Sequence, residues 1–519
     1  MSRSDSRLAS QRSDERPSAS ARTWMGFATM CLGMFMAILD VQVVATSIPT
    51  IQAALAVEPD RISDVQTAYL IAEVIAIPLT GLLTRVLTMR WLFVSTLALF
   101  TLASAGCAAS PNFSTLIGWR LLQGFSGGTL IPAVFAAVFL LFPDRQQGLA
   151  TTIGGVLAVL APTVGPIVGG WITETWSWHW LFLINVAPGL VAVLAAIWLL
   201  PAAPLALDQA RRLDLVALTL MATALAALIL GLKEAPQRGW LSVPVAGLMA
   251  LSAATLAGFI VRTLKSRAPI VDVRMAADPA FAVGCVLSFV LGIGLFGSVY
   301  MIPVFLAVAH GYGALTIGTI MLVTGMAQLA TAPLAVALER RMDARLLSAL
   351  GFLAFAIGLG ASAFQVPETD HAGMFWPQVM RGTAIMFCLL PPTRMALGHL
   401  APEAVPDASG LFNLMRNLGG AIGLALIDTV IFSRAPVHAA DLLEKLRAGD
   451  ATTARALGLP PELVAAGGIG ALGDEMKLML QPMIERLAFV DAMNEAWGLV
   501  ALITLAAIAG LAFARPPAH

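Results

Sequence analysis

Charged residues are scarce in this chain. Only 12% of its 519 residues are Asp, Glu, Lys or Arg, whereas 58% are hydrophobic and the mean hydropathy is +0.83. Soluble domains carry about twice that charged fraction, roughly 25%, so the composition excludes a water-soluble fold. The 31 cationic and 31 anionic residues cancel, and the zero net charge predicts nothing about partners.

Cysteine is also rare, and its placement excludes a disulfide framework or a thiolate metal site. Cys31, Cys107, Cys285 and Cys388 are far apart, and each lies inside an apolar run, as small core residues do. The chain has no paired histidines, no His-Glu-x-x-His sequence and no phosphate-binding loop. We therefore expect neither an enzyme nor an ATP-driven pump, and no cofactor, metal or nucleic-acid partner. A receptor would need a sizeable soluble ligand domain, which the sequence lacks.

Long apolar runs, in contrast, recur from end to end. Each is close to the ~20 residues with which a helix crosses a bilayer, and the runs are continuous rather than alternating. The sequence predicts about fourteen spans, at residues 24–48, 65–87, 91–109, 113–141, 148–171, 178–200, 213–232, 239–264, 280–309, 315–338, 346–365, 373–398, 408–432 and 490–514. The first run lacks a signal-peptide cleavage pattern and is retained. We expect an all-α integral membrane protein.

Cationic residues gather in alternate connections. One side has Arg3, Arg7, Arg12, Arg16, Arg22, Arg85, Arg90, Arg145, Arg211, Arg212, Arg262, Lys265, Arg267, Arg274, Arg340, Arg341 and Arg345, whereas the opposite short connections have only Arg61, Lys233 and Arg238. This asymmetry predicts that both termini are cytoplasmic and that residues 433–489 lie outside.

The external segment 433–489 carries an amphipathic stripe broken by a proline. The stripe consists of Met476, Met479, Met483 and Leu487, and Pro482 interrupts it. Two interpretations are open: a helix lying against its own protein or the membrane surface, or a docking surface for a partner.

The chain also contains a weak internal echo. Arg120-Leu-Leu-Gln-Gly124 in the fourth run corresponds to Gln378-Val-Met-Arg-Gly382 in the twelfth, and a proline follows each at a similar distance. Two six-span halves with two extra spans between them would explain this echo.

Ionisable residues inside the spans are the candidates for chemistry. A charge at bilayer depth is costly, so it normally faces a wet cavity or a partner. Asp40 and Glu73 lie within the first two runs, and Arg120 enters the fourth beside Gln123. Desolvation opposed by a nearby arginine makes either acid a candidate proton site. Asp40 is alternatively a backbone-bonded structural residue, Glu73 a structural ion-pair partner or cation-binding group, and Arg120 an interhelical pairing residue.

Further charges lie in the twelfth and thirteenth runs, namely Arg381, Arg394, Arg416 and Asp428. We expect Arg416, with Asn413 and Asn417, either to tie helices together or to contact substrate. Arg394 is expected at a membrane face, and Asp428 near the outer end, where it is solvated.

The fifth run contains an unusual pattern of glycine and proline. Gly165, Gly169 and Gly170 remove side chains from part of one helix, which lets a neighbour pack at backbone distance. Pro162 and Pro166 remove backbone donors from the same helix and favour a bend. The pattern predicts a helix that bends and packs tightly against a moving partner.

These motifs together resemble the fourteen-span drug:proton antiporters of the major facilitator superfamily (EmrB/QacA-like) over nearly the whole chain. Residues 161–170 match the family's antiporter motif, and Arg120 through Gly124 match its fourth-span motif, whose arginine is implicated in proton transfer. The remaining matches are Asp40 through Ile51, Ile77 through Leu83, Leu183 through Gly189, and Ser409 through Gly420.

One motif departs from the family pattern. The loop after the second span usually reads Gly-x-x-x-Asp-Arg-x-Gly, but here Gly81 through Thr88 lacks the acid, and Thr88 replaces the last glycine. The usual charge relay at this loop is therefore in doubt.

The resemblance implies a domain plan and a function. The plan has tails at 1–22 and 515–519, a six-helix bundle at 23–201, two extra helices at 202–265 and a second bundle at 266–514 that includes external loop 433–489. It implies proton-coupled efflux of amphipathic drugs or toxic compounds across the plasma (bacterial inner) membrane by alternating access. Asp40, Glu73 and Arg120 would couple protons, whereas Gln123, Gly124, Arg381, Asn413 and Arg416 would serve packing or gating. Related exporters work with a periplasmic adaptor and an outer-membrane channel. A proton-coupled transporter of a specific metabolite on the same fold stays open as an alternative.

Overall fold

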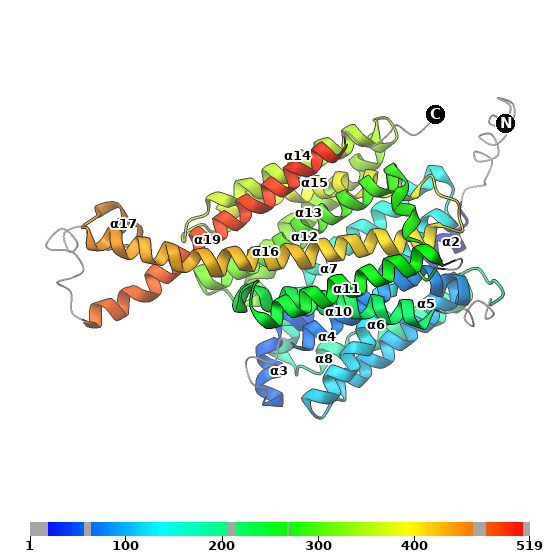
Figure 1. Ribbon diagram of the computed structural model, residues 1–519, viewed down its shortest axis with the longest axis horizontal. Helices are drawn as coiled ribbons and strands as arrows, with labels where there is room; N and C mark the ends of the chain where they lie inside the picture. Colours follow the sequence, from blue (N-terminus) through cyan, green and yellow to red (C-terminus); the bar gives the residue numbers. More distant parts are fainter. Residues whose placement is uncertain (1–18, 57–63, 206–213, 267–268, 460–473, 512–519) are drawn as a thin grey trace.

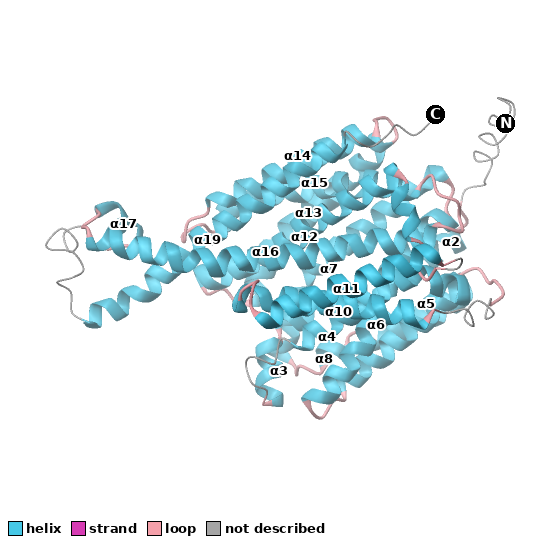
Figure 2. Ribbon diagram, in the orientation of Figure 1, coloured by secondary structure: helices cyan, strands magenta, loops and turns pink. Residues whose placement is uncertain are grey.

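The computed structural model describes residues 19–56, 64–205, 214–266, 269–459 and 474–511, which form helices joined by turns and contain no strand (Figures 1 and 2). The first half and the linking pair contain α2 (Ala21–Thr46), α3 (Ile48–Leu55), α4 (Asp64–Ala76), η1 (Ile77–Leu79), α5 (Thr80–Ala108), α6 (Phe113–Leu141), α7 (Asp144–Thr175), α8 (Trp180–Leu183), α9 (Val186–Leu199), α10 (Leu215–Arg238) and α11 (Val243–Lys265). The second half contains η3 (Val273–Ala277), α12 (Pro279–His310), α13 (Ala314–Glu339), α14 (Ala344–Gly360), η4 (Ala361–Phe364), α15 (His371–Leu397), α16 (Val405–Arg447), α17 (Ala451–Ala456) and α19 (Asp474–Gly510).

Among the described residues, 12 helical segments are long and apolar enough to cross a membrane. One of them, Asp64–Ala108, has 45 residues and breaks helical geometry at Thr88, so it covers the second and third predicted runs. The helix α15 is not among the twelve, but it coincides with the twelfth predicted run and packs between α13 and α14. The all-helical membrane architecture is confirmed. Most of the predicted N-terminal tail, the C-terminal tail, and Arg61, Arg211, Arg212 and Arg267 lie outside the described residues.

Polar side chains set the start of several helices. Asn112 Oδ1 accepts a hydrogen bond from the Thr115 amide (3.0 Å) at the start of α6. Asp278 caps α12 and Asp370 caps α15 in the same way. Each cap satisfies backbone donors that the first helical turn leaves free, so these residues fix where the spans begin.

The helices pack as two halves with the extra pair against one seam. The helices α10 and α11 pack on each other, and α10 also contacts α4 of the first half and α16 of the second. The beginning of α2 and the end of α19 lie at the same end of the molecule, which we call the terminal end (Figure 1). The opposite end is called the far end.

The last two long helices extend well beyond the predicted spans. The helix α16 has 43 residues and α19 has 37, and their far halves project from the bundle together with α17 (Figure 1). A separate small core of Leu442, Leu446, Leu457, Leu480 and Ile484 holds this hairpin together. The described residues of segment 433–489 are therefore largely helical.

The far half of α19 packs against α16, which agrees with the interpretation of a helix lying on its own protein. The helix α19 runs through Pro482 without ending, so this proline interrupts the stripe but not the helix. The side chains of Met476 and Met479 lie outside the described residues, and Met483 is 40% exposed.

Candidate functional site

The fourth span presents a fully buried ion pair inside the first half. Arg120 on α6 is 0% exposed and Asp40 on α2 is 1% exposed. Arg120 Nη1 donates to Asp40 Oδ2 at 2.5 Å, and Arg120 Nε donates to the carbonyl oxygen of Val65 on α4 at 3.2 Å. The guanidinium also lies over the Tyr69 ring, 4.4 Å from its centroid. One arginine thus connects α2, α4 and α6.

Amide and hydroxyl groups add further contacts to this pair, although Arg120 Nη2 is buried without a hydrogen-bond partner. Gln123 Nε2 donates to Asp40 Oδ1 at 2.9 Å and to Ser104 Oγ at 2.8 Å, while its Oε1 accepts from Arg120 Nη1 at 2.7 Å. Asn185 Nδ2 donates to Asp40 Oδ1 at 2.7 Å. Asp40 therefore accepts from three side chains, which offsets the desolvation of its charge.

Sequence reasoning missed two members of this network. Asn185 precedes α9, and Ser104 lies on α5, so neither is a near neighbour of Asp40 in sequence. For Ser104 the only signal was a polar residue in an apolar run, whereas Asn185 lies in the matched stretch Leu183 through Gly189, which does not connect it with Asp40. The sequence left open which acid lies near Arg120, and the structure pairs Arg120 with Asp40.

Glu73 differs from Asp40 in its surroundings. It lies on α4, is 6% exposed, and its carboxylate forms no hydrogen bond or ion pair with any described residue. A Cβ at Gly128 on α6 would lie 2.5 Å from the Glu73 carbonyl oxygen. The missing side chain at Gly128 thus lets α4 and α6 approach at the level of this acid. A buried carboxylate without a fixed partner is suited to exchange a proton or bind a cation.

The Gly/Pro helix lies between the two halves. The helix α7 runs continuously through Pro162 and Pro166, and a Cβ at Gly165 would clash with Gln42 of α2. On the other side, a Cβ at Gly318 of α13 would clash with Ile167. The close approach predicted for Gly165 is present. Gly169 contributes its carbonyl oxygen, which accepts from Thr173 Oγ1 at 2.6 Å.

The loop motif that departs from the family pattern pairs with the opposite half. Arg85 donates to Asp407, which lies in the first turn of α16, and a Cβ at Gly81 would clash with the same carboxylate. Ser409 Oγ on α16 donates to the Pro132 carbonyl oxygen on α6 at 2.8 Å. Arg85 thus pairs with an acid on α16, whereas the family pattern has an acid in the loop itself. These contacts close the seam at the terminal end.

The second half holds its arginines with fewer partners. Arg381 on α15 is 2% exposed, donates to Ser362 Oγ at 2.7 Å, and lies over the Trp497 ring. Arg416 on α16 is 7% exposed and forms no hydrogen bond or ion pair with a described residue. Asn413 donates to the carbonyl oxygen of Ser409 at 2.9 Å.

Arg394 and Asp428, both expected at the periphery of the bundle, each have a side-chain partner in the structure. Arg394 is partly exposed and pairs with buried Glu339 at 2.8 Å, so it anchors α15 to α13. Asp428 is only partly buried, and it accepts from Tyr300 Oη at 2.7 Å. The expectation of a simply solvated Asp428 is therefore wrong, because α12 supplies a hydroxyl partner.

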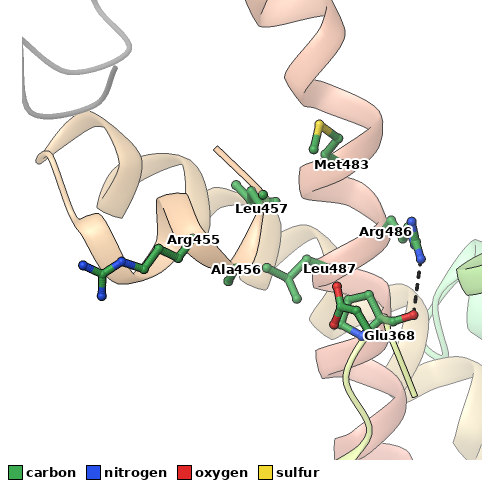
Figure 3. Close-up of a pocket in the computed structure, with 9 residues that line it drawn as sticks. Glu368, Arg455, Ala456, Leu457, Met483, Arg486 and Leu487 are labelled. Atoms are coloured by element: carbon green, nitrogen blue, oxygen red, sulfur yellow. Dashed lines mark hydrogen bonds between the residues drawn. The ribbon is translucent and has the colours of Figure 1, made fainter. Parts of the chain in front are cut away.

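A further pocket lies away from these residues, on the projecting hairpin. It has a volume of about 180 Å³ and is lined by Pro367, Glu368, Arg455, Ala456, Leu457, Gly458, Met483, Arg486 and Leu487 (Figure 3). Arg486 donates to the Pro367 carbonyl oxygen at 3.2 Å, which ties the hairpin to the loop before α15. None of the predicted proton-coupling residues borders it.

The helical halves, the buried charge network and the glycine-rich seams define the class of polytopic membrane transporters with two repeated bundles. Residues 30–424 match the model of the Major Facilitator Superfamily. The chain belongs to this superfamily, and it is a multi-pass membrane transporter rather than an enzyme.

The relatives agree on this class. The chain is 35% identical to the colistin resistance protein EmrB of Acinetobacter baumannii over 82% of this chain and 83% of that one. It is 27% identical to the multidrug export protein EmrB of Escherichia coli (97% of each chain) and 28% identical to the fatty acid resistance protein FarB of Neisseria gonorrhoeae (95% and 97%). The solved proton:xylose symporter XylE shares the fold with TM-score 0.55 at 13% identity, covering 93% of this chain and 95% of its own. The chain is thus similar to EmrB-type proteins of the superfamily over most of its length.

Proposed function

We propose that this protein exports amphipathic compounds in exchange for protons, by alternating access between its two halves. The observation that carries the proposal is Glu73, a buried carboxylate with no fixed partner beside the Asp40–Arg120 network. Such an acid releases or gains a proton at lower cost than one held by an arginine and two amides. The names of the relatives, which cover multidrug export, colistin resistance and fatty acid resistance, support a broad amphipathic substrate class.

The roles divide between the two acids. Glu73 is the exchanging group, since its carboxylate is free to pair with a proton or a cationic substrate in turn. Asp40 and Arg120 connect α2, α4 and α6 and determine the electrostatic potential at the Glu73 carboxylate. Protonation of Glu73 removes a buried charge, which favours one arrangement of the halves over the other.

The seams define how the halves move. The pair Arg85–Asp407 and the Ser409–Pro132 bond close the terminal end and must break when that end opens. The glycine-rich contact between α7 and α13 keeps the halves in close packing while they rock.

The proposal includes location and partners. The cationic residues at the terminal end, among them Arg85, Arg145 and Arg340, support a plasma-membrane (bacterial inner-membrane) location with both termini in the cytoplasm. The projecting hairpin then lies outside the cytoplasm. In a two-membrane cell, a periplasmic adaptor and an outer-membrane channel are the proposed partners, by similarity to related exporters.

The test uses inside-out vesicles energised to hold an acidic interior. Wild type, Glu73→Gln and Asp40→Asn are compared, with Asp441→Asn, an exposed acid on the hairpin, as control. A cationic dye is added while a separate lumenal probe reports pH. We expect the dye to dissipate the gradient in wild type and in Asp441→Asn, less so in Asp40→Asn, and not at all in Glu73→Gln.

Two outcomes would change the proposal. Loss of coupling in Asp40→Asn with full coupling in Glu73→Gln would move the proton site to Asp40. If no compound in a panel of cations, anions and neutral amphiphiles disturbs the gradient, drug efflux is contradicted, and a specific metabolite becomes the substrate to seek.

A further inference from the structure

Arg416 is a buried cation with aromatic neighbours but with no hydrogen bond or carboxylate partner among the described residues. Its Nε and Nη2 atoms are inaccessible to solvent and make no hydrogen bond, and no described carboxylate pairs with it. A buried guanidinium normally has a carboxylate or several carbonyl oxygens around it, because an unpaired charge in a low-dielectric interior is strongly destabilising. Arg120 in the first half has such partners, and Arg416 does not.

The position of Arg416 is on the seam between the halves. The guanidinium lies 5.3 Å from the ring centroid of Phe135, which belongs to α6 of the first half, and 5.5 Å from that of Phe412 on its own helix. It lies about 16 Å along α16 from Val405, which is near the middle of a bilayer-spanning helix. Opening of the terminal end, as proposed above, would expose this part of the seam to a substrate.

Glu73 and Arg416 lie at different levels along α6, Glu73 packed within the first half and Arg416 on the seam between the halves. Gly128 contacts the backbone of Glu73, and Phe135 contacts Arg416, so seven residues of α6, about 10 Å, separate the two levels. Glu73 on α4 and Arg416 on α16 are therefore separate sites that contact α6 at two levels. Arg416 is nearer the terminal end.

We propose that Arg416 binds the anionic head group of amphipathic substrates, with a carboxylate as the preferred group. This rests on the proposed function. A guanidinium offers a carboxylate two parallel donors, and its aromatic neighbours Phe135 and Phe412 suit the adjoining apolar part of the ligand. A bound anion also compensates the charge that closure of the seam buries, so loading favours closure.

The test is a binding measurement on the full-length protein in lipid nanodiscs, with empty nanodiscs as the baseline. Radiolabelled octanoate and octylammonium serve as probes because they share a chain length and differ in charge. Wild type is compared with Arg416→Met and Arg416→Lys. Arg381→Met is the matched control, since Arg381 is also buried but bonds to Ser362 within the second half.

We expect saturable octanoate binding that weakens about tenfold or more in Arg416→Met, the loss of roughly one charge-assisted contact. Arg416→Lys should retain part of the affinity, and Arg381→Met all of it. Octylammonium binding should stay unchanged in every variant. The proposal is overturned if wild type shows no saturable octanoate binding, or if Arg416→Met weakens both probes equally.

The dye assay separates this proposal from the proposed function. Dye-coupled proton release that depends on Glu73, together with octanoate binding indifferent to Arg416, would refute the anion site and leave antiport standing. Octanoate binding that depends on Arg416 without any dye coupling would refute cation antiport and leave the anion site.

Discussion

Gly124 on α6 and Gly382 on α15 occupy corresponding places in the two halves. A Cβ at Gly124 would clash with the Tyr69 carbonyl oxygen on α4, and a Cβ at Gly382 with the Thr324 carbonyl oxygen on α13. The correspondence extends to a serine on the third helical segment of each half. Gln123 donates to Ser104, and Arg381 donates to Ser362. The helix-packing framework is therefore shared.

The charges built on this framework differ. Arg120 and Gln123 in the first half become Gln378 and Arg381 in the second, so the arginine moves from one position to the other. The helix α2 provides Asp40, whereas α12 contains no acidic residue. Glu73, four residues after Tyr69, corresponds to Gln328, whose Nε2 donates to the Gly155 carbonyl oxygen at 3.3 Å. At these corresponding positions the first half therefore has two acids and an arginine, whereas the second half has an arginine and no acid.

The largest expected effect on stability comes from removing Arg120 of the first half, and removing Arg381 of the second half should not match it. Arg120→Met leaves Asp40 buried with amide donors only, and breaking a buried pair costs about 3–5 kcal/mol. Arg381→Met removes a charge that has one hydroxyl partner and no acid, so we expect little loss or a slight gain. The midpoint of thermal unfolding of the purified proteins in detergent measures both.

A double variant sharpens this result. Asp40→Asn combined with Arg120→Met should recover part of the stability lost in Arg120→Met, because no buried charge is then unpaired. Equal destabilisation by Arg120→Met and Arg381→Met would contradict the contrast between the halves.

The shared helix packing predicts that substituting the corresponding glycine in each half lowers stability by a similar amount. This loss should be smaller than that caused by Arg120→Met. Gly124→Ala and Gly382→Ala each place a methyl group against a backbone carbonyl oxygen, so a helix pair must separate. We expect each to cost about 1–3 kcal/mol, as overpacked contacts do, and to lower the unfolding midpoint similarly. Gly498→Ala, where a Cβ would meet nothing, is the control. A large loss in one half only would show that the framework is not equivalent.

The sequence was sufficient for the framework but not for the charge network. Continuous apolar runs predict the spans, because bilayer thickness dictates helix length. The extensions of α16 and α19 were missed, since beyond the bilayer their stability comes from a small core of residues such as Leu442 and Leu480, which no hydropathy window detects. The partners Asn185 and Ser104 were missed because contacts between distant spans depend on packing that one sequence does not reveal.

The smallest expected change in stability comes from substitutions in the turn between the second and third helices of each half. In the first half, Thr88 has φ 67° and ψ 160°, a conformation open to glycine but strained for a β-branched residue, and its hydroxyl is buried without a partner. The corresponding turn of the second half, between Glu339 and Ala344, has no positive φ. Thr88→Gly should therefore raise stability by about 1 kcal/mol, because it removes strain and an unsatisfied hydroxyl at the cost of added chain entropy. Met342→Gly in the other turn adds chain entropy and removes a partly buried side chain without relieving strain, so it should lower the midpoint. A lower midpoint in Thr88→Gly as well would mean that the surrounding contacts, Arg85–Asp407 among them, depend on the threonine side chain.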